Sequence, residues 1–334
     1  MGYYIRLIKP NEIPELCNLI YQIYGDTYVH KNMYDRKNME ILNKSKRLIS
    51  FVAIGDKEEV IAHVGLKIDG PQGEMSAAFV KKEYRRQNIL YDLSEQVVQY
   101  GKQLGLEAIY VMSITSHIYS QKVASKLGFK DCAFLISCME PMRFKGIIEK
   151  TVRESLKVTY LFYDKPDYLK LYIPSSLQKV LNLIYTNLRI NVKPMPESEE
   201  SIWEKSEINI TYTDASICYI DINRLGKDLL EELDKVITQY DNDYISSIYL
   251  YIRLEDSLVH KFYEEFTRRN FFFAGIMPGK KNNRLILQKV KEIHPDSIKI
   301  NSSIGNKIFQ HILESKKHIT LANENKKHRY PKVI

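Results

Sequence analysis

The alternation of hydrophobic and polar residues along the chain predicts strands and helices in mixed order. Residues 4–8 alternate as a strand does. Apolar residues then return every three or four positions between Asn11, a helix-capping residue, and Gly25, a helix-ending one. Further strand and helix patterns follow up to residue 138, in the order β-α-α-β-β-β-α-β-α-β. This order predicts an α/β (α+β) fold with a mixed central sheet.

The same pattern gives approximate limits for each element. The predicted strands of the first part cover residues 4–8, 50–54, 60–68, 74–80, 108–114 and 129–138. The predicted helices cover residues 11–25, 35–42, 89–104 and 120–127. Glycines at 70 and 73 flank a proline and predict the turn between two of the strands.

A second α/β unit is predicted from about residue 150. Its strands are expected over residues 158–163, 208–212, 217–222, 245–252, 271–276 and 284–290. Its helices are expected from residue 175 and over residues 226–240 and 256–269. In outline, this unit repeats the β-α-β-α-β-β ending of the first. The predicted domains are therefore 1–145 and 150–292, followed by a basic, flexible tail over 293–334.

The charge of the chain changes this picture little. The 334 residues include 49 Lys or Arg and 41 Asp or Glu, a formal net charge of +8. Six Lys or Arg and two Glu lie between residues 314 and 334, which places half of the excess in the predicted tail. A basic chain invites a nucleic-acid interpretation. Because so much of the charge belongs to one terminal segment, we favour a solvated tail together with a local site for an anion.

The number and spacing of the four cysteines argue against a metal site. Cys17, Cys132, Cys138 and Cys218 form no CxxC pair and have no close histidine cluster, so we expect no metal site. Isolated cysteines of this kind are typical of a reduced, cytoplasmic compartment. We also expect no signal peptide and no membrane span, because neither pattern occurs in the sequence.

The loop after the strand that ends at Val80 is the strongest candidate for chemistry. It carries Arg85 and Arg86, and a helix begins near Ile89. The unpaired amides of a helix N-terminus attract anions such as phosphate, and the two arginines add full charges beside them. A basic surface turn that merely enters a helix is the alternative interpretation.

This loop resembles the acetyl-CoA loop of GNAT acyltransferases, which reads Arg/Gln-x-x-Gly-x-Gly/Ala after a strand. Arg85 stands at its first position, Asn88 at its first glycine and Leu90 at its second. Asparagine tolerates the left-handed backbone of a glycine position better than most residues do. The resemblance implies that acetyl-CoA, or another acyl-CoA, is the cofactor, with main-chain pairing of its pantetheine to Phe79 and Val80. The implied cofactor-binding residues are Phe79, Val80, Arg85, Arg86, Gln87, Asn88, Ile89 and Leu90.

A second segment, residues 117–129, also resembles this family. It ends in the Leu-Gly-Phe of the family, with His117 where the family has an asparagine. Ala124 stands where many members carry the tyrosine that protonates the leaving thiolate. The resemblance therefore implies Tyr119 or His117 as the proton donor. A loop or helix-capping histidine is the alternative for His117.

Two further stretches point to one subgroup of the family. Residues 23–35, together with the His-Ile-Tyr-Ser-Gln-Lys run at 117–122, resemble bacterial GNAT proteins that are often fused to a histidine-kinase-type ATPase module. That subgroup tends to carry a bulky residue where Leu90 stands.

The resemblance implies direct transfer of an acyl group to an amine, which needs a base. Glu74, on the strand that leads to Val80, is the candidate base, and a solvent-facing glutamate is the alternative. His63, in the middle of another strand, is interpreted as a core histidine. The candidate acceptor wall is aromatic, with plain packing as the alternative. Its residues are Tyr24, Tyr28 and Tyr34.

Two other function classes stay open at this point. The alanine at 124 suits a non-catalytic acyl-CoA-binding regulator, and the net charge suits a transferase that works with aminoacyl-tRNA or another nucleic acid. We expect a small-molecule or protein amine as the acceptor, no membrane partner and a homodimer. The second unit lacks an arginine-rich loop, so we expect it not to bind acyl-CoA.

Overall fold

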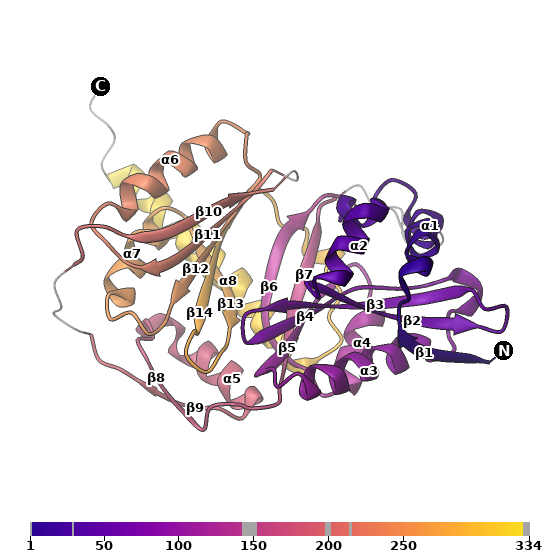
Figure 1. The fold of residues 1–334 in the computed structure, drawn as a ribbon. Coiled ribbons are helices and arrows are strands. Elements are labelled where there is room, and N and C mark those ends of the chain that lie inside the picture. The colour runs from indigo at the N-terminus through magenta and orange to yellow at the C-terminus, as the bar shows by residue number, and fades with distance from the viewer. Residues whose placement is uncertain (1, 29, 142–151, 198–201, 214–215, 330–334) are drawn as a thin grey trace. The chain divides into compact units, whose positions relative to one another are not determined.

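The computed structural model describes residues 2–28, 30–141, 152–197, 202–213 and 216–329, with side chains as far as residue 324. The chain folds into two compact units, which Figure 1 shows as a ribbon. Unit 1 consists of Met1–Lys130, Met139–Lys165 and Ser297–Lys299. Unit 2 consists of Asp131–Cys138, Pro166–Asp296 and Ile300–Ile334.

Unit 1 is built on a mixed sheet in the order β1-β2-β3-β4-β5-β7. All neighbours in it are antiparallel except β4 and β5, which are parallel. A parallel pair needs a crossover connection, and α3 supplies it here. The strands are β1 (Tyr3–Leu7), β2 (Leu48–Gly55), β3 (Val60–Asp69), β4 (Gln72–Val80), β5 (Ala108–Ile114) and β7 (Glu154–Phe162).

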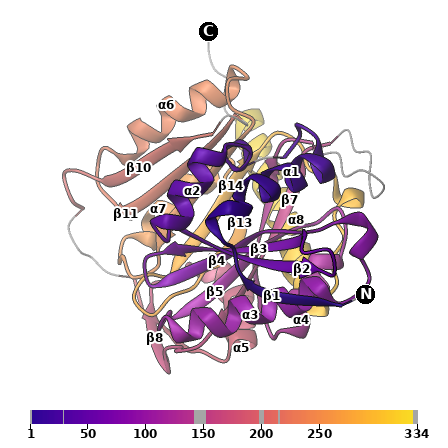
Figure 2. The ribbon, with the colours of Figure 1, turned by 45° about the vertical axis from the view of Figure 1, so that its right-hand side comes forward.

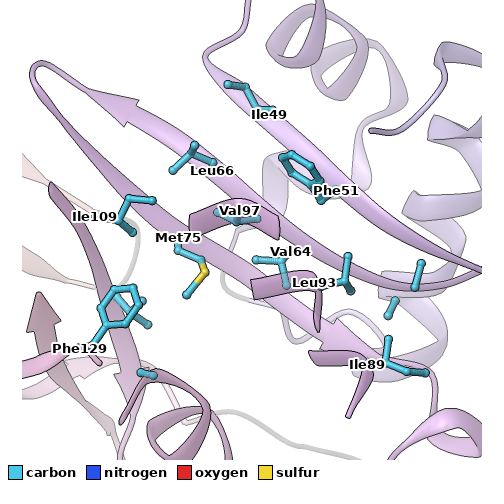
Figure 3. Packing of buried hydrophobic residues seen from close by; sticks show 14 of the residues in the cluster. Ile49, Phe51, Val64, Leu66, Met75, Ile89, Leu93, Val97, Ile109 and Phe129 are labelled. Atoms are coloured by element: carbon cyan, nitrogen blue, oxygen red, sulfur yellow. The ribbon is translucent and has the colours of Figure 1, made fainter. Parts of the chain in front are cut away.

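Helices cover both faces of the unit 1 sheet. Figures 1 and 2 show α1 (Ile13–Tyr24) and α2 (Arg36–Lys44) on one face, with α3 (Ile89–Gln103) and α4 (Tyr119–Lys126) on the other. Short 3-10 turns are η1 (Pro10–Glu12), η2 (Lys31–Tyr34) and η3 (Lys82–Tyr84). Two apolar clusters result, one on each face. Figure 3 shows the cluster under α3, where Ile89, Leu93 and Val97 meet the strands.

The main strands of unit 2 neighbour one another in the order β6-β13-β14-β12-β11-β10, with both parallel and antiparallel pairs. Its strands are β6 (Lys130–Met139), β10 (Glu207–Tyr212), β11 (Ile217–Arg224), β12 (Ser247–Arg253), β13 (Phe272–Met277) and β14 (Arg284–Val290). Its helices are α5 (Gln178–Leu188), α6 (Leu229–Asp241), α7 (Val259–Arg268) and α8 (Ser303–Arg329), with 3-10 turns η4 (Ser175–Leu177) and η5 (Pro295–Ser297). A separate parallel pair joins β8 (Tyr168–Leu171) to β9 (Asn191–Pro194).

The two halves of the chain share one sequence of elements, as the pattern predicts. In the first half, β4 and β5 are parallel and β5 pairs antiparallel with β7. In the second half, β11 and β12 are parallel and β12 pairs antiparallel with β14. In each half, one helix connects the parallel strands and another follows the second of them. The repeat is thus one of topology.

The units do not follow the expected limits of 1–145 and 150–292. Strand β7, expected to open the second unit, pairs with β5 along its length, from Ala108–Phe162 to Ile114–Leu156. Strand β6, expected to close the first unit, pairs with β13 at Ala133–Gly275 and belongs to unit 2. The predicted boundary between residues 145 and 150 lies outside the described residues. Strand pairing over a long sequence separation leaves no trace in local pattern, so the sequence did not reveal this exchange.

The tail expected to be flexible forms helix α8 as far as Arg329, and residues 330–334 lie outside the described residues. Three apolar side chains of α8 are buried at helical spacing: Ile308, Phe309 and Ile312. The ring centroids of Phe309 and Phe134, a residue of β6, lie 5.6 Å apart. The sequence did not predict this helix, because lysines are interspersed among its apolar positions. The burial of these side chains holds the helix in place because most helical stability comes from tertiary packing.

Candidate active site

Strands β4 and β5 separate part-way along their length. Their parallel register covers only three pairs, from Gln72–Ala108 to Glu74–Tyr110. Strand β4 then continues to Val80 and β5 to Ile114 without a further pair in the described register. The edge of β4 that faces β5 is therefore open from residue 75 to residue 80. Open strand edges offer main-chain donors and acceptors to an extended ligand.

A bulge in β4 lies beside this opening. Ala77 has a φ of +52°, and the register with β3 shifts there, between His63 and Gly65. His63 is fully buried, lies 2.7 Å by its Nδ1 from the carbonyl oxygen of Ala77 and stacks on Phe79 at 5.1 Å. A carbonyl oxygen can only accept, so Nδ1 carries the proton. Burial lowers the pKa of His63 to about 4, and the neutral ring holds the bulge in place.

The last residues of β4 turn their amides in opposite directions. The Lys81 N–H donates to the Ile61 carbonyl oxygen of β3 at 2.8 Å. Backbone directions alternate along a strand, so Phe79 also faces β3, whereas Val80 faces the open edge. The Val80 carbonyl oxygen accepts from Arg85 Nε at 3.2 Å. Of the two residues expected to pair with pantetheine, Val80 is thus directed toward the opening and Phe79 is not.

The loop between β4 and α3 adopts the backbone that glycines would favour. Arg86 has a φ of +67°, and Asn88, the N-cap of α3, has a φ of +61° and makes no side-chain capping bond. The first intrahelical bond runs from Asp92 N–H to the Asn88 carbonyl oxygen. The amides before Asp92 consequently remain without intrahelical acceptors, with Arg85 and Arg86 just before them in sequence. Such a terminus suits an anion.

The side chains of this loop divide their roles. Ile89 is buried in the core cluster under α3, and Leu90 packs partly against it. Only the amides of these two residues are therefore suited to a ligand. Gln87 is partly buried and Arg86 is exposed.

The left-handed backbone at Asn88 gives a first prediction. Asn88→Val should lower the free energy of unfolding by about 1–2 kcal/mol, because a β-branched side chain is costly at positive φ. Asn88→Gly is the matched control and should not destabilise the protein. Urea unfolding of the two variants measures the difference. Equal stability of the valine and glycine variants would contradict the geometry described here.

Glu74 lies where the two strands part, in the last pair of the β4–β5 ladder. Its side chain is 17% exposed, and Oε2 lies 3.7 Å from Nζ of Lys67, its partner across the β3–β4 hairpin. Burial raises the pKa of Glu74, with a smaller rise from Asp69, while Lys67 acts in the lowering direction. A carboxylate of raised pKa at the mouth of an opening is suited to accept a proton.

An aromatic cluster lies beside this carboxylate. The Tyr24 ring is 4.6 Å from Tyr28 and 6.2 Å from Phe79, and Tyr28 is 6.4 Å from Phe79. Burial raises the pKa of Tyr28, and the charges of Tyr24 and Glu74 add to that rise. Tyr34 differs, because its hydroxyl donates to the Gly25 carbonyl oxygen and accepts from the Tyr28 amide. Tyr34 therefore fixes the loop after α1.

The two candidate proton donors lie just before α4 and at its first residue. Tyr119 opens α4 and is 62% exposed; its amide donates to His117 Nδ1 at 3.4 Å, and the two rings are 5.2 Å apart. Both follow Ile114, the last residue of β5, which lies about 13 Å along the strand from Tyr110, the partner of Glu74. Their role as proton donors stays a prediction. Ala124, at the position of the missing tyrosine, is 2% exposed and lies in the core cluster.

The part of the chain that the structure describes contains neither a metal-binding cluster nor a membrane-spanning helix. No group of three His, Cys, Asp or Glu there could hold a metal ion. Among the same residues, no helix combines the length and apolarity needed to cross a bilayer.

The segment that contains the opening, the loop and Glu74 also matches a known family. Its model, described as acetyltransferase (GNAT) family, aligns with residues 13–129. The match covers about a third of the chain, and the similarity is that of this stretch. No curated protein matches the chain by sequence.

Solved structures similar to this chain include three acetyltransferases. The ribosomal-protein-S18-alanine N-acetyltransferase of Escherichia coli is 13% identical, with 49% of this chain and 96% of that chain covered and a TM-score of 0.40. The ribosomal-protein-S5-alanine acetyltransferase of Vibrio fischeri is 17% identical, with 50% and 97% covered and a TM-score of 0.41. A putative acetyltransferase of Salmonella typhimurium, solved with acetyl-CoA, is 12% identical, with 49% and 96% covered and a TM-score of 0.41.

The second half lacks the opening found between β4 and β5. Strands β11 and β12 pair without interruption from Ile217–Ser247 to Ile222–Ile252. The loop before α6 is covered by its own chain, because Trp203 bridges Gly226 and the Ser206 amide and hydroxyl both donate to Asp228. Acidic residues also occupy the first turn of α6. These features disfavour an anion at that helix.

Three features near the candidate site are not predicted by the sequence pattern. One is Lys67, which the turn at Gly70 places opposite Glu74 through the register of the hairpin. His30 stacks edge-on to Tyr28 at 5.5 Å, and burial lowers its pKa. His63 was recognised as a core residue, but its bond to the bulge depends on a register shift that the pattern does not show.

Proposed function

We propose that unit 1 transfers an acetyl group from acetyl-CoA to an amine. The observation that carries this proposal is the open edge of β4, which ends at the uncapped N-terminus of α3 and begins at Glu74. The edge suits the amide-bearing pantetheine arm, and the helix N-terminus with Arg85 suits the pyrophosphate. The GNAT family match supports the same reaction.

The reaction follows from these positions. The amine nitrogen attacks the thioester carbonyl carbon; the new C–N bond forms as the C–S bond breaks, and the thiolate leaves. Glu74 takes the proton that the amine loses, directly or through a water molecule. The Val80 amide, directed into the opening, pairs with an amide of the pantetheine arm and so helps to hold the thioester along the strand edge. Tyr24 and Tyr28 form the wall against which the acceptor lies.

No described residue is well placed to donate the proton that the leaving thiolate takes up. Ala124 cannot donate, and Tyr119 lies exposed at the start of α4. This arrangement favours a second candidate function, that of a regulator that binds acyl-CoA but does not catalyse acyl transfer. Solvent water is the donor in our proposal, which leaves His117 and Tyr119 as secondary contributors.

Acetyl-CoA binding and turnover decide between these functions. We expect wild-type protein to bind acetyl-CoA in a calorimetric titration and to release free CoA with at least one member of a broad amine panel. Arg85→Gln should weaken binding about tenfold or more, since it removes a charge-assisted contact. Lys57→Gln, at an exposed β2–β3 turn, is the matched control and should bind as the wild type does. Binding without turnover would establish the regulator; an Arg85 variant that binds normally would remove the proposed cofactor loop.

Several finer predictions accompany this proposal. The similarity of residues 23–35 and 117–122 supports membership of the subgroup often fused to an ATPase module. The acceptor is proposed to be a small-molecule or protein amine, because the surroundings of Glu74 combine aromatic rings with a carboxylate. A cytoplasmic location, a homodimer and the nucleic-acid-linked alternative stay predictions from the sequence.

A further inference from the structure

Unit 2 contains a cleft that the proposed reaction does not use. It lies between helix α8, the end of α6 and strands β13 and β14, and it measures about 260 Å³. This size suits a small ligand. The residues that line it are Tyr240, Asn270, Phe272, Lys289, Val290, Lys291, Lys316, Ile319, Thr320, Asn323 and Glu324.

The charge of the cleft is strongly basic. Three lysines line it, against the single carboxylate of the exposed Glu324. The ammonium groups of Lys289 and Lys291 lie 4.9 Å and 5.2 Å from the ring centroid of Tyr240, so both are held over one aromatic side chain. Like charges gathered in this way repel one another, and an anion between them would relieve that repulsion.

The three lysines differ in the partners that they have within the protein. Lys289 Nζ donates to the Arg269 carbonyl oxygen at 3.2 Å, and Lys291 pairs with Asp243. Lys316 is partly buried, with its Nζ 5.8 Å from the Phe272 ring centroid. Among residues whose side chains are described, no carboxylate pairs with it. Burial lowers the pKa of Lys316, the effect expected when an ammonium group lacks a counter-charge.

We propose that this cleft binds a small polyanion that carries phosphate groups, with Lys316 as the principal contact and Lys289 and Lys291 beside it. Lysine binds phosphate as a compact point charge, so three lysines around one small cleft suit a compact anion with several phosphate charges. The cleft lies wholly within unit 2, so this site is separate from the loop at Arg85. It also gives a role to part of the basic excess that the sequence places after residue 314.

Calorimetric titration of the full chain with inorganic pyrophosphate tests the proposal. Pyrophosphate is also expected to bind at Arg85, so the titrations use Arg85→Gln as the background. On that background we expect one remaining site. Lys316→Gln should weaken its affinity about tenfold or more, while Lys317→Gln, at the exposed neighbour on α8, should leave it unchanged.

Two further arms make the result decisive. Lys316→Arg keeps the charge and should retain most of the affinity, which separates loss of charge from damage to α8. Citrate, a polyanion without phosphate, should bind more weakly than pyrophosphate. The proposal is overturned if the Arg85→Gln background binds no pyrophosphate, if Lys316→Gln and Lys317→Gln behave alike, or if citrate binds as tightly as pyrophosphate.

Discussion

Glu74→Gln is expected to lower kcat/KM for acetyl transfer by about 10²–10⁴, the usual contribution of a positioned general base. Such a loss corresponds to about 3–5 kcal/mol of transition-state stabilisation. Glutamine has nearly the same shape but cannot take the proton from the attacking amine. Affinity for acetyl-CoA should hardly change, because Glu74 lies at the far end of β4 from the Arg85 loop. Steady-state kinetics with the best amine of the panel, alongside a binding titration, checks both expectations.

The pH dependence separates a base from a merely structural carboxylate. A base works only when deprotonated, so the rate should rise with pH through the pKa of Glu74, which burial raises above its usual value. Lys67 acts on that pKa in the lowering direction, and Lys67→Met should therefore move the rising limb to higher pH. A Glu74→Gln enzyme with near-normal turnover, or a limb that ignores the Lys67 change, would remove Glu74 from the mechanism.

The second large effect concerns stability and depends on His63. Its folded-state pKa of about 4 lies below the unfolded value of 6.5. Between these two pH values the unfolded chain binds more protons than the folded one, so stability falls as pH falls. The contribution is fully present above pH 6.5. The expected loss between pH 7.5 and pH 5 is about 2 kcal/mol, from 1.36 kcal/mol per pKa unit.

His63→Gln isolates this contribution from that of every other group. A glutamine amide can still donate to the Ala77 carbonyl oxygen at the bulge but does not titrate. The variant should therefore show a pH dependence smaller by about 2 kcal/mol than that of the wild type. Urea unfolding at the two pH values, followed by circular dichroism, gives the comparison. If both proteins lose the same stability on acidification, His63 is protonated in the folded state and the neutral-ring assignment fails.

Local pattern predicted most elements because each has its own signal. The helix expected over 89–104 occurs as Ile89–Gln103, and the strand expected over 108–114 occurs as Ala108–Ile114. Asn88 does adopt the left-handed backbone that its place in the loop requires. Charge, by contrast, concealed the buried stripe of α8, because the lysines of that segment mask the helical spacing of Ile308 and Ile312.

The candidate site was harder to predict because it depends on pairings between distant residues. The opening exists only because the β4–β5 ladder stops at Glu74, and where a ladder between two distant strands ends has no local signal in the sequence. Which of Phe79 and Val80 faces that opening depends on the β3 register, which no local signal states. The proton donors were predicted by their place in a motif, and a motif does not state how far they lie from Glu74.

Because β6 belongs to unit 2 and β7 to unit 1, the chain cannot be divided between these strands into two complete units. A first fragment ending near residue 145 would lack β7 and leave β5 with an unpaired edge, while the remainder would lack β6 beside β13. Exposed strand edges promote aggregation. Neither half is thus suited to expression, shuffling or fusion by itself. The function of each unit is better tested by point substitutions in the whole chain than by deletion.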